Sequence, residues 1–353
     1  MTLAMKTSSG NFFEDFKLGQ TLVHATPRTL TEGDVALYTA LYGSRFAVQS
    51  ADSFARALGY PRSPLDDLLV FHTVFGKTVP DISLNAVANL GYAEGHFVKP
   101  VYPGVSLTAV SEVIGLKENS NKQTGVVYVR TQGFDENDDA VLSYVRWVMV
   151  RKRDVEAPVG EAHVPKLAAA VSAQDLVAPW NTGFTEFDTA LSGSPHLWDD
   201  YQVGEKIDHV DGMTVEEAEH ALATRLYQNT ARVHFNQFTE GKGRFGKRLI
   251  YGGHVISLAR ALSFNGLANA FSIAAINAGR HVNPLFAGDT VFAWSEVLDK
   301  QPVTDRKDVG ALRLRLVATK NLPCSEFPDK NADGQYPETV ILDFDYWAFA
   351  RRR

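Results

Sequence analysis

The clearest pattern of apolar and polar positions lies in the C-terminal half of the chain. Between His254 and Leu267, apolar residues fall on almost every side of a helical projection, which predicts a fully buried helix. Four later segments are rich in apolar and β-branched residues and predict strands, at 274–282, 290–298, 311–319 and 340–350. A buried helix followed by antiparallel strands is an α+β arrangement. Its simplest form is a curved sheet wrapped around a central helix.

A second helix is predicted earlier in each half of the chain. It spans Thr31 to Leu41 in the first half and Thr214 to Leu226 in the second. Thr214 is followed three residues later by Glu217, which is a capping-box pattern and predicts where the second of these helices begins. A polar loop separates each of these helices from the apolar segment that follows.

The chain contains an internal duplication. Four segments of the first half recur in the same order 184 or 185 positions later: Asp15–Gln20 as Asp200–Glu205, Leu41–Tyr42 as Leu226–Tyr227, Val98–Gly104 as Val282–Gly288, and Ser111–Val113 as Ser295–Val297. Constant spacing over this length predicts two copies of one domain. We place them at 1–156 and 195–353. The linker, 157–194, is rich in Ala, Pro, Ser and Gly and is expected to lie across the surface.

Composition narrows the class of protein. The 353 residues include 35 Lys and Arg against 41 Asp and Glu, a formal net charge of −6, which argues against a nucleic-acid partner. A lone cysteine excludes an intramolecular disulfide and fits a reducing compartment. Neither a targeting segment nor an apolar run of about 20 residues is visible, so we expect a cytoplasmic protein without membrane contact.

Several common chemistries lack their motifs. The sequence contains no G-x-G-x-x-G after a predicted strand, no phosphate-binding G-x-x-x-x-G-K-[ST], no H-E-x-x-H and no G-x-S-x-G. One cysteine cannot build a cysteine-based zinc site. We therefore expect neither a bound nucleotide cofactor nor a metal.

Two segments of the second copy carry candidate chemistry. Asn229 and His234 place an amide and an imidazole five residues apart in a polar loop. Downstream, Tyr251 to His254 open the apolar helix with two glycines, Gly252 and Gly253. The first N–H groups of a helix have no internal partner and stabilise negative charge, including a developing oxyanion.

These residues resemble the MaoC-like dehydratase family, whose domains have the hotdog fold. The family carries Asp-x-Asn-Pro-x-His in this loop, and the matching positions here hold Asn229, Ala231, Arg232 and His234, so the His alone is kept. The first copy has Ser44 and Gln49 at the two catalytic positions. The family's Pro-x-x-x-Gly-Asp is present at Pro284–Asp289. Other segments extend the resemblance over nearly the whole chain, namely Leu65–Leu68, Val70–His72, Phe75–Asp81, Leu116–Asn121 and Tyr251–Arg260.

The resemblance implies a double hotdog, with the site in the second copy and a first copy that shapes the pocket. It implies a hydro-lyase that reversibly hydrates the double bond of a branched, dicarboxylic acyl-CoA, with CoA entering as part of the substrate. No metal or redox cofactor is implied. A homodimer is plausible.

The resemblance also implies roles for individual residues. His234 would act as general base or acid on the water, which Asn229 would orient. A backbone N–H of Gly253 or His254 would hold the enolate oxygen, although His254 could equally pack at the helix start. The substrate contacts predicted from this part of the sequence are Arg232 for the second carboxylate, Tyr251 and Gly252 in the pocket, and Lys242, Arg244, Lys247 and Arg248 for the CoA phosphates.

One departure from the family leaves the mechanism open. Asn229 cannot accept a proton, so either His234 carries out both proton transfers or a carboxylate such as Asp66 or Asp67 participates. The role of His72 is equally open. Two other functions remain as alternatives: an acyl-CoA thioesterase on the same fold, and a protein that binds acyl-CoA without turnover.

Overall fold

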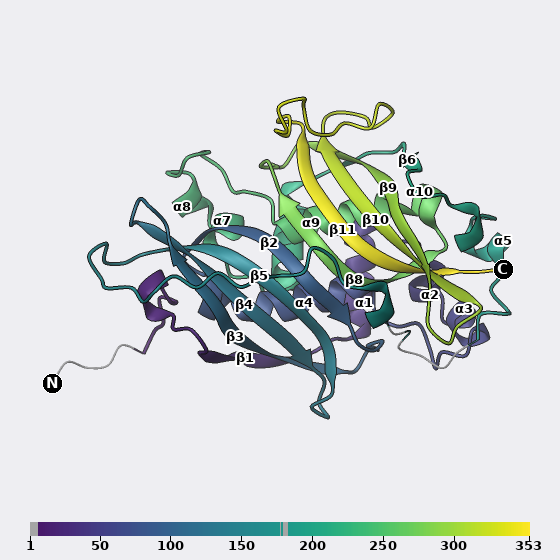
Figure 1. Cartoon of the computed structure of the whole chain (residues 1–353), viewed down its shortest axis with the longest axis horizontal. Helices are drawn as coiled ribbons and strands as arrows, with labels where there is room; N and C mark the ends of the chain where they lie inside the picture. Colours follow the sequence, from purple (N-terminus) through teal and green to yellow (C-terminus); the bar gives the residue numbers. More distant parts are fainter. Residues whose placement is uncertain (1–5, 177, 179–182) are drawn as a thin grey trace.

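A computed structural model describes residues 6–176, 178 and 183–353 (Figure 1). The first copy consists of β1 (Thr21–Thr29), α1 (Glu32–Tyr42), α2 (Ala47–Ser50), α3 (Asp52–Ala57), α4 (Asp67–Thr78), a π-helical turn η2 (Val79–Ser83), β2 (Ala86–Phe97), β3 (Ser106–Glu118), β4 (Thr124–Phe134) and β5 (Ala140–Arg151). A 3-10 turn, η1 (Phe13–Asp15), precedes it.

The second copy repeats this order. It consists of β6 (Lys206–Asp208), β7 (Met213–Thr214), α6 (Glu217–Leu226), α7 (Arg232–Phe235), α8 (Gln237–Glu240), α9 (Gly252–Leu262), α10 (Phe264–Leu267), β8 (Ala270–His281), β9 (Thr290–Pro302), β10 (Val309–Lys320) and β11 (Val340–Arg351). Between the copies lie η3 (Ala173–Asp175), α5 (Thr189–Ser192) and η4 (Trp198–Asp200). The four predicted strands are confirmed as β8 to β11.

One antiparallel sheet runs through both copies. Its strand order is β1-β3-β4-β5-β2-β8-β11-β10-β9-β6, with β7 paired to β9. The copies join where β2 pairs with β8, and there Ala93 lies opposite Ala278. The sheet curves around α4 in one half and α9 in the other (Figure 1). This is the predicted α+β double hotdog.

Contacts between equivalent residues mark a pseudo-twofold axis between the copies. The hydroxyl of Tyr227 donates a hydrogen bond to that of Tyr42 at 2.8 Å, and these residues are 185 positions apart. A Cβ atom on Gly76 of α4 would lie 1.8 Å from the carbonyl oxygen of Tyr227, so the central helix of one copy touches the backbone of the other. The duplication is therefore also the symmetry of the packing.

Three local predictions differ from the structure. The N-cap of α6 is Glu216, whose backbone N–H is bound by Glu219 at 3.3 Å, while Thr214 belongs to β7, so the predicted capping box is wrong. Both glycines lie inside α9. That helix ends at Leu262, and the expected continuation to Leu267 is interrupted where Gly266 adopts a φ of +103°.

The linker is more deeply packed than expected. Val171, Leu176 and Phe184 are buried in one cluster with α2, α3 and strands of the second copy. The backbone carbonyl of Val171 accepts a hydrogen bond from the Trp347 indole at 3.0 Å. Burial of the linker's apolar side chains is favourable, so part of this segment belongs to the hydrophobic core and does not lie across the surface as predicted. Within the described ranges, none of the helices is long and apolar enough to cross a membrane.

Candidate active site

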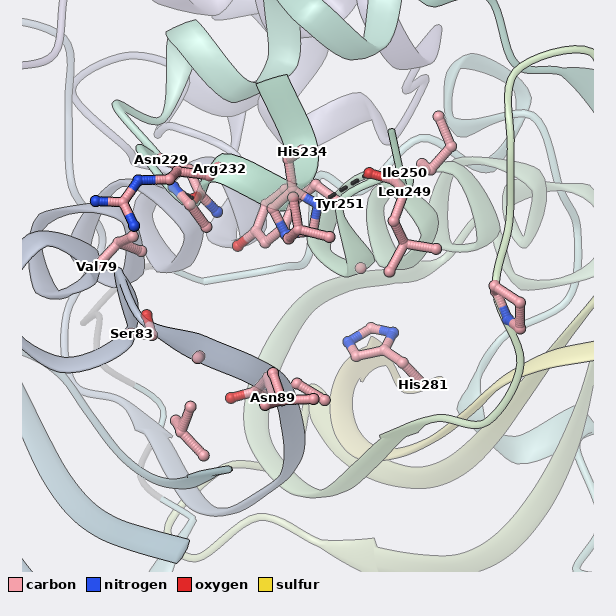
Figure 2. Close-up of a pocket in the computed structure, with 18 of the residues that line it drawn as sticks. Val79, Ser83, Asn89, Asn229, Arg232, His234, Leu249, Ile250, Tyr251 and His281 are labelled. Carbon is pink, nitrogen blue, oxygen red and sulfur yellow. Dashed lines mark hydrogen bonds between the residues drawn. The ribbon is translucent and has the colours of Figure 1, made fainter. Parts of the chain in front are cut away.

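A cavity of about 500 Å³ lies between the two copies (Figure 2). That volume suits a small-molecule site. The second copy contributes Asn229, Arg232, His234, Tyr251 and Gly252, all of which were predicted. The first copy contributes walls from α4, η2, β2 and β5, among them Phe75, Ser83 and Tyr92, and Asn85 from the turn between η2 and β2. The second copy therefore supplies the predicted motif, and the first copy completes the walls of the cavity.

The imidazole of His234 has a fixed tautomer. Its Nδ1–H donates to the carbonyl oxygen of Leu249 at 2.9 Å, the bond drawn in Figure 2. Leu249 in turn donates its N–H to the carbonyl of Val233 at 3.0 Å, which ties both sides of the loop to α7. Nε2 of His234 is thus left with its lone pair. Burial lowers the pKa of His234 to about 4, so the ring is a neutral base near neutral pH.

Asn229 shapes the turn that leads into α7. Its Oδ1 accepts the backbone N–H of Ala231 at 3.0 Å, and the residue is 4% exposed. This bond leaves the Nδ2 group as the polar end of the side chain that is still available to a ligand. Asn229 can therefore orient a bound water but cannot remove its proton.

The first turn of α9 keeps free backbone donors beside the cavity. The N–H of Tyr251 is bound by Nε2 of His220 at 2.9 Å, and the N–H of His254 by the carbonyl of Tyr251 at 2.9 Å. The N–H groups of Gly252 and Gly253 make no hydrogen bond with the described part of the chain. Of the two predicted oxyanion donors, Gly253 has a free N–H but does not line the cavity, where Gly252 does, and the N–H of His254 is occupied.

The side chain of His254 lies away from the cavity. It is fully buried, and its Nδ1 is 3.0 Å from the hydroxyl of Tyr42. Burial lowers its pKa to about 3. Of the two roles open for His254, the geometry fits packing.

The predicted basic residues separate into two groups. Arg232 lines the opening of the cavity as an exposed residue, and its Nη1 donates to Oδ1 of Asn85 at 3.2 Å. Arg151 is a second exposed cation at this opening. The others, which do not line the cavity, are Lys242, Arg244, Lys247 and Arg248. The last of these forms an ion pair with Glu217, and the first three lie over the rings of Phe238, Phe245 and Phe286.

The titratable candidates of the first copy also lie outside the cavity. Asp66 caps α4 by accepting the N–H of Leu68 at 2.9 Å, and Asp67 accepts that of Ile273 at 2.7 Å. Burial raises the pKa of Asp67 to about 7. His72 is fully buried, with Nε2 3.1 Å from the hydroxyl of Ser257. Asp67 and His72 thus bond across the junction of the copies and Asp66 within the first copy, and none of the three lines the cavity.

Sequence reasoning missed three residues of this region. His281, at the end of β8, lines the cavity, and Tyr92 of β2 binds it, with the two side chains joined at 3.2 Å. His220 holds the start of α9. The duplication offered a signal for His281, since the first copy has Phe97 at the equivalent position 184 residues earlier. Among the residues placed by the structure, no group of three or more His, Cys, Asp or Glu side chains could hold a metal ion.

Comparison with known proteins agrees with this geometry. The family described as mesaconyl-CoA hydratase matches residues 3–324. A β-methylmalyl-CoA dehydratase of Chloroflexus aurantiacus is 63% identical over 351 residues, covering 99% of this chain and 100% of the relative. A mesaconyl-CoA hydratase of Cereibacter sphaeroides is 63% identical over 348 residues, with coverage of 99% and 100%.

Solved structures give the same grouping. A MaoC domain dehydratase from Chloroflexus aurantiacus superposes with a TM-score of 0.97 at 63% identity, over 99% of this chain and 100% of that one. A double-hotdog protein of Mycobacterium tuberculosis shares the fold, with a TM-score of 0.74 at 24% identity over 98% and 99% of the two chains. With its MaoC-like double hotdog and a family match that covers most of its length, this chain belongs to the mesaconyl-CoA hydratase family.

Proposed function

We propose that this chain catalyses the reversible hydration of mesaconyl-CoA (2-methylfumaryl-CoA) to β-methylmalyl-CoA. The observation that carries the proposal is His234, a neutral imidazole whose Nε2 lone pair is left free by the bond from Nδ1 to Leu249. It lines a cavity sized for a small molecule, in a member of a family named for this reaction. Family membership supports the substrate, and the site supports the chemistry.

The addition of water requires a base and an acid. Nε2 of His234 takes a proton from water as the oxygen bonds to the β-carbon, and the π-electrons move onto the thioester oxygen as an enolate. Because Asn229 cannot accept a proton, the imidazolium of His234 then returns its proton to the α-carbon, which carries the methyl group. The donor group Nδ2 of Asn229 orients the water. One side chain thus carries both proton transfers.

The enolate oxygen needs hydrogen-bond donors. The N–H groups of Gly252 and Gly253 at the start of α9 have no partner in the described chain, Gly252 lines the cavity, and the helix end adds a favourable field. One preorganised donor of this kind contributes about 3 kcal/mol to the transition state. Gly253 would tolerate no side chain, since a Cβ would lie 2.4 Å from the ring of Tyr251.

The anionic groups of the substrate need cations. Arg232 is our candidate for the free carboxylate, and its guanidinium is held by Asn85 at the cavity opening. Arg151 lies at the same opening and would meet the phosphates of CoA. Guanidinium groups bind both carboxylate and phosphate with paired hydrogen bonds.

We further propose that the reaction needs no metal or redox cofactor and that it takes place in the cytoplasm. Dialysis against a chelator should then leave the rate unchanged. A homodimer stays a prediction, which the molar mass in solution would test.

The direct test is loss of the enoyl-thioester absorbance when purified protein meets mesaconyl-CoA, with crotonyl-CoA alongside. We expect fast loss with the dicarboxylic substrate, slower loss with crotonyl-CoA, and a fall of about 10²–10⁴-fold in His234→Ala. Release of free thiol would instead indicate a thioesterase. Binding of the thioester with neither hydration nor thiol release would indicate a non-catalytic acyl-CoA-binding protein.

A further inference from the structure

A second imidazole lies in the cavity. His281 ends β8 as a half-buried residue, and it lies across the cavity from His234 and Tyr251 (Figure 2). An acyl group in the cavity would therefore lie between two histidines, one of which the proposed mechanism does not use.

The ring of His281 packs against the first turn of α9. A Cβ atom on Gly252 would lie 2.4 Å from both Cε1 and Nε2 of that ring. The imidazole thus occupies the space that any side chain at position 252 would fill. It is thereby placed beside the free N–H groups that would hold the thioester oxygen.

The hydrogen bond to Tyr92 decides which nitrogen of His281 carries the proton. The Tyr92 hydroxyl is 3.2 Å from Nε2, and no other described residue bonds to that hydroxyl. Burial raises the pKa of Tyr92, so the phenol stays protonated and needs an acceptor. With that O–H donating to Nε2, the ring proton is on Nδ1. Burial and the nearby His234 lower the pKa of His281 to about 4, so the ring is neutral.

The first copy shows that the fold does not require this histidine. The equivalents of His281 and Gly252 there are Phe97 and Asp67, while the equivalent of His234 is Gln49. The two imidazoles that line the cavity are thus both absent from the copy that lacks the catalytic motif. A phenyl ring serves the same position in the sheet of that copy.

We infer that His281 is a catalytic residue that donates its Nδ1–H to the thioester oxygen of the substrate and to the enolate oxygen formed from it, and that Tyr92 is its positioning residue. A neutral imidazole polarises a carbonyl without giving up its proton. The bond strengthens as charge develops on the oxygen, so it lowers the barrier more than it tightens binding. This inference rests on the proposed hydration, in which His234 acts on the water from the opposite wall.

The variants follow from the two copies. His281→Phe installs the residue that the first copy uses, and it removes the donor while keeping a ring in the space beside Gly252. We expect kcat to fall about 10²–10³-fold with KM changed less than threefold, and His281→Asn, which restores an N–H donor, to recover about tenfold. Tyr92→Phe should lower kcat about tenfold because the ring proton of His281 is then no longer held on Nδ1. His163→Phe is the matched control, since His163 is exposed and outside the cavity.

A second readout separates this role from packing. The saturated thioester 2-methylsuccinyl-CoA, labelled with 13C at the thioester carbon, binds without reacting, and a hydrogen bond to its oxygen lowers the carbonyl stretching frequency. We expect the bound frequency to rise in His281→Phe and to stay low in His281→Asn and His163→Phe. This measurement needs only binding, so it tests His281 even if mesaconyl-CoA is not hydrated, in which case the proposed function alone fails.

Two results would overturn the inference. One is a His281→Phe variant that hydrates mesaconyl-CoA within threefold of the unaltered chain. The other is an unchanged carbonyl frequency in that variant, with activity lost and not recovered in His281→Asn, which would assign the ring a packing role. Where His281→Phe fails to fold, as its melting temperature would show, His281→Asn and Tyr92→Phe decide by the same frequency shift.

Discussion

Acid sensitivity of the fold follows from its buried histidines. Burial lowers the pKa of seven of the 10 histidines, His96 among them, and in six it does so to values of about 2 to about 4: His72, His209, His220, His234, His254 and His281. An unfolded histidine takes up a proton near pH 6.5. Below that pH the unfolded chain binds more protons than the folded one, so stability is lost as the pH falls from 6.5 towards these folded values.

The magnitude can be worked out for a shift from pH 7 to pH 5.5. Each of these six folded pKa values lies more than one unit below 5.5. Each of the six histidines therefore lowers the free energy of unfolding by about 1.2 kcal/mol over this interval, and together they lower it by about 7 kcal/mol. Asp67 works in the opposite sense. The pKa of Asp67 is about 7 in the folded chain and 3.8 in the unfolded one, so protonation of Asp67 raises the free energy of unfolding by roughly 1.6 kcal/mol over the same interval. The net loss is about 6 kcal/mol, a large part of the 5–15 kcal/mol that stabilises a typical domain.

Thermal unfolding of the ligand-free chain would measure this loss. For 353 residues, an unfolding entropy of about 2.1 cal/mol/K per residue converts 6 kcal/mol into a fall in Tm of about 8 °C. His254→Gln keeps an acceptor for the Tyr42 hydroxyl but cannot titrate, so it should reduce the pH dependence of the unfolding free energy by about one-fifth. The control variant His163→Gln, at an exposed position, should leave that pH dependence unchanged. A Tm that falls by less than 2 °C between pH 7 and pH 5.5 would refute the reasoning.

Three further predictions concern single side chains. Gly252→Ala should displace the His281 ring and lower kcat at least tenfold with the fold retained; an unchanged kcat would contradict the placement of that ring. Gly76→Ala should destabilise the chain by about 1–3 kcal/mol in urea unfolding, because its Cβ meets the carbonyl of Tyr227, whereas Gly33→Ala in α1 has room and should be neutral or stabilising. Arg232→Ala should raise KM for the CoA thioester at least tenfold with less effect on kcat, and the effect should shrink at high salt; a salt-independent KM would argue against a charge contact.

Much of the fold could be predicted from the sequence because its signals are local or periodic. The strands after position 270 appear as apolar, β-branched segments, and the two central helices as nearly continuous apolar ones. The duplication follows from spacing alone, and it identifies Tyr42 and Tyr227 as equivalent residues, although their hydrogen bond was shown only by the structure. His234, Asn229 and the glycines that start α9 were found because they lie within 25 positions of one another in a recognisable order.

The capping box and the linker show where local signals fail. Thr214 has the right spacing to Glu217, but pairing of β7 with β9 holds that residue in a strand, and the helix begins later. The linker has a loop-like composition, yet Phe184 is fully buried because it packs in an apolar cluster with residues of both copies. In both cases a tertiary contact outweighed a local preference.

The sequence by itself determined the two-copy architecture and the family, and it indicated the histidine that we propose acts on water, since each is written in residues close together or at constant spacing. Only the tertiary structure decided which side chains share the cavity. His281 and Tyr92 are 189 positions apart and meet because β2 and β8 pair at the junction of the copies. The same folding left Arg232 at the cavity opening, and the 242–248 basic cluster and the side chain of His254 outside it. The physical reason is that the site is formed between two domains, and contacts across such an interface leave no pattern along either chain segment.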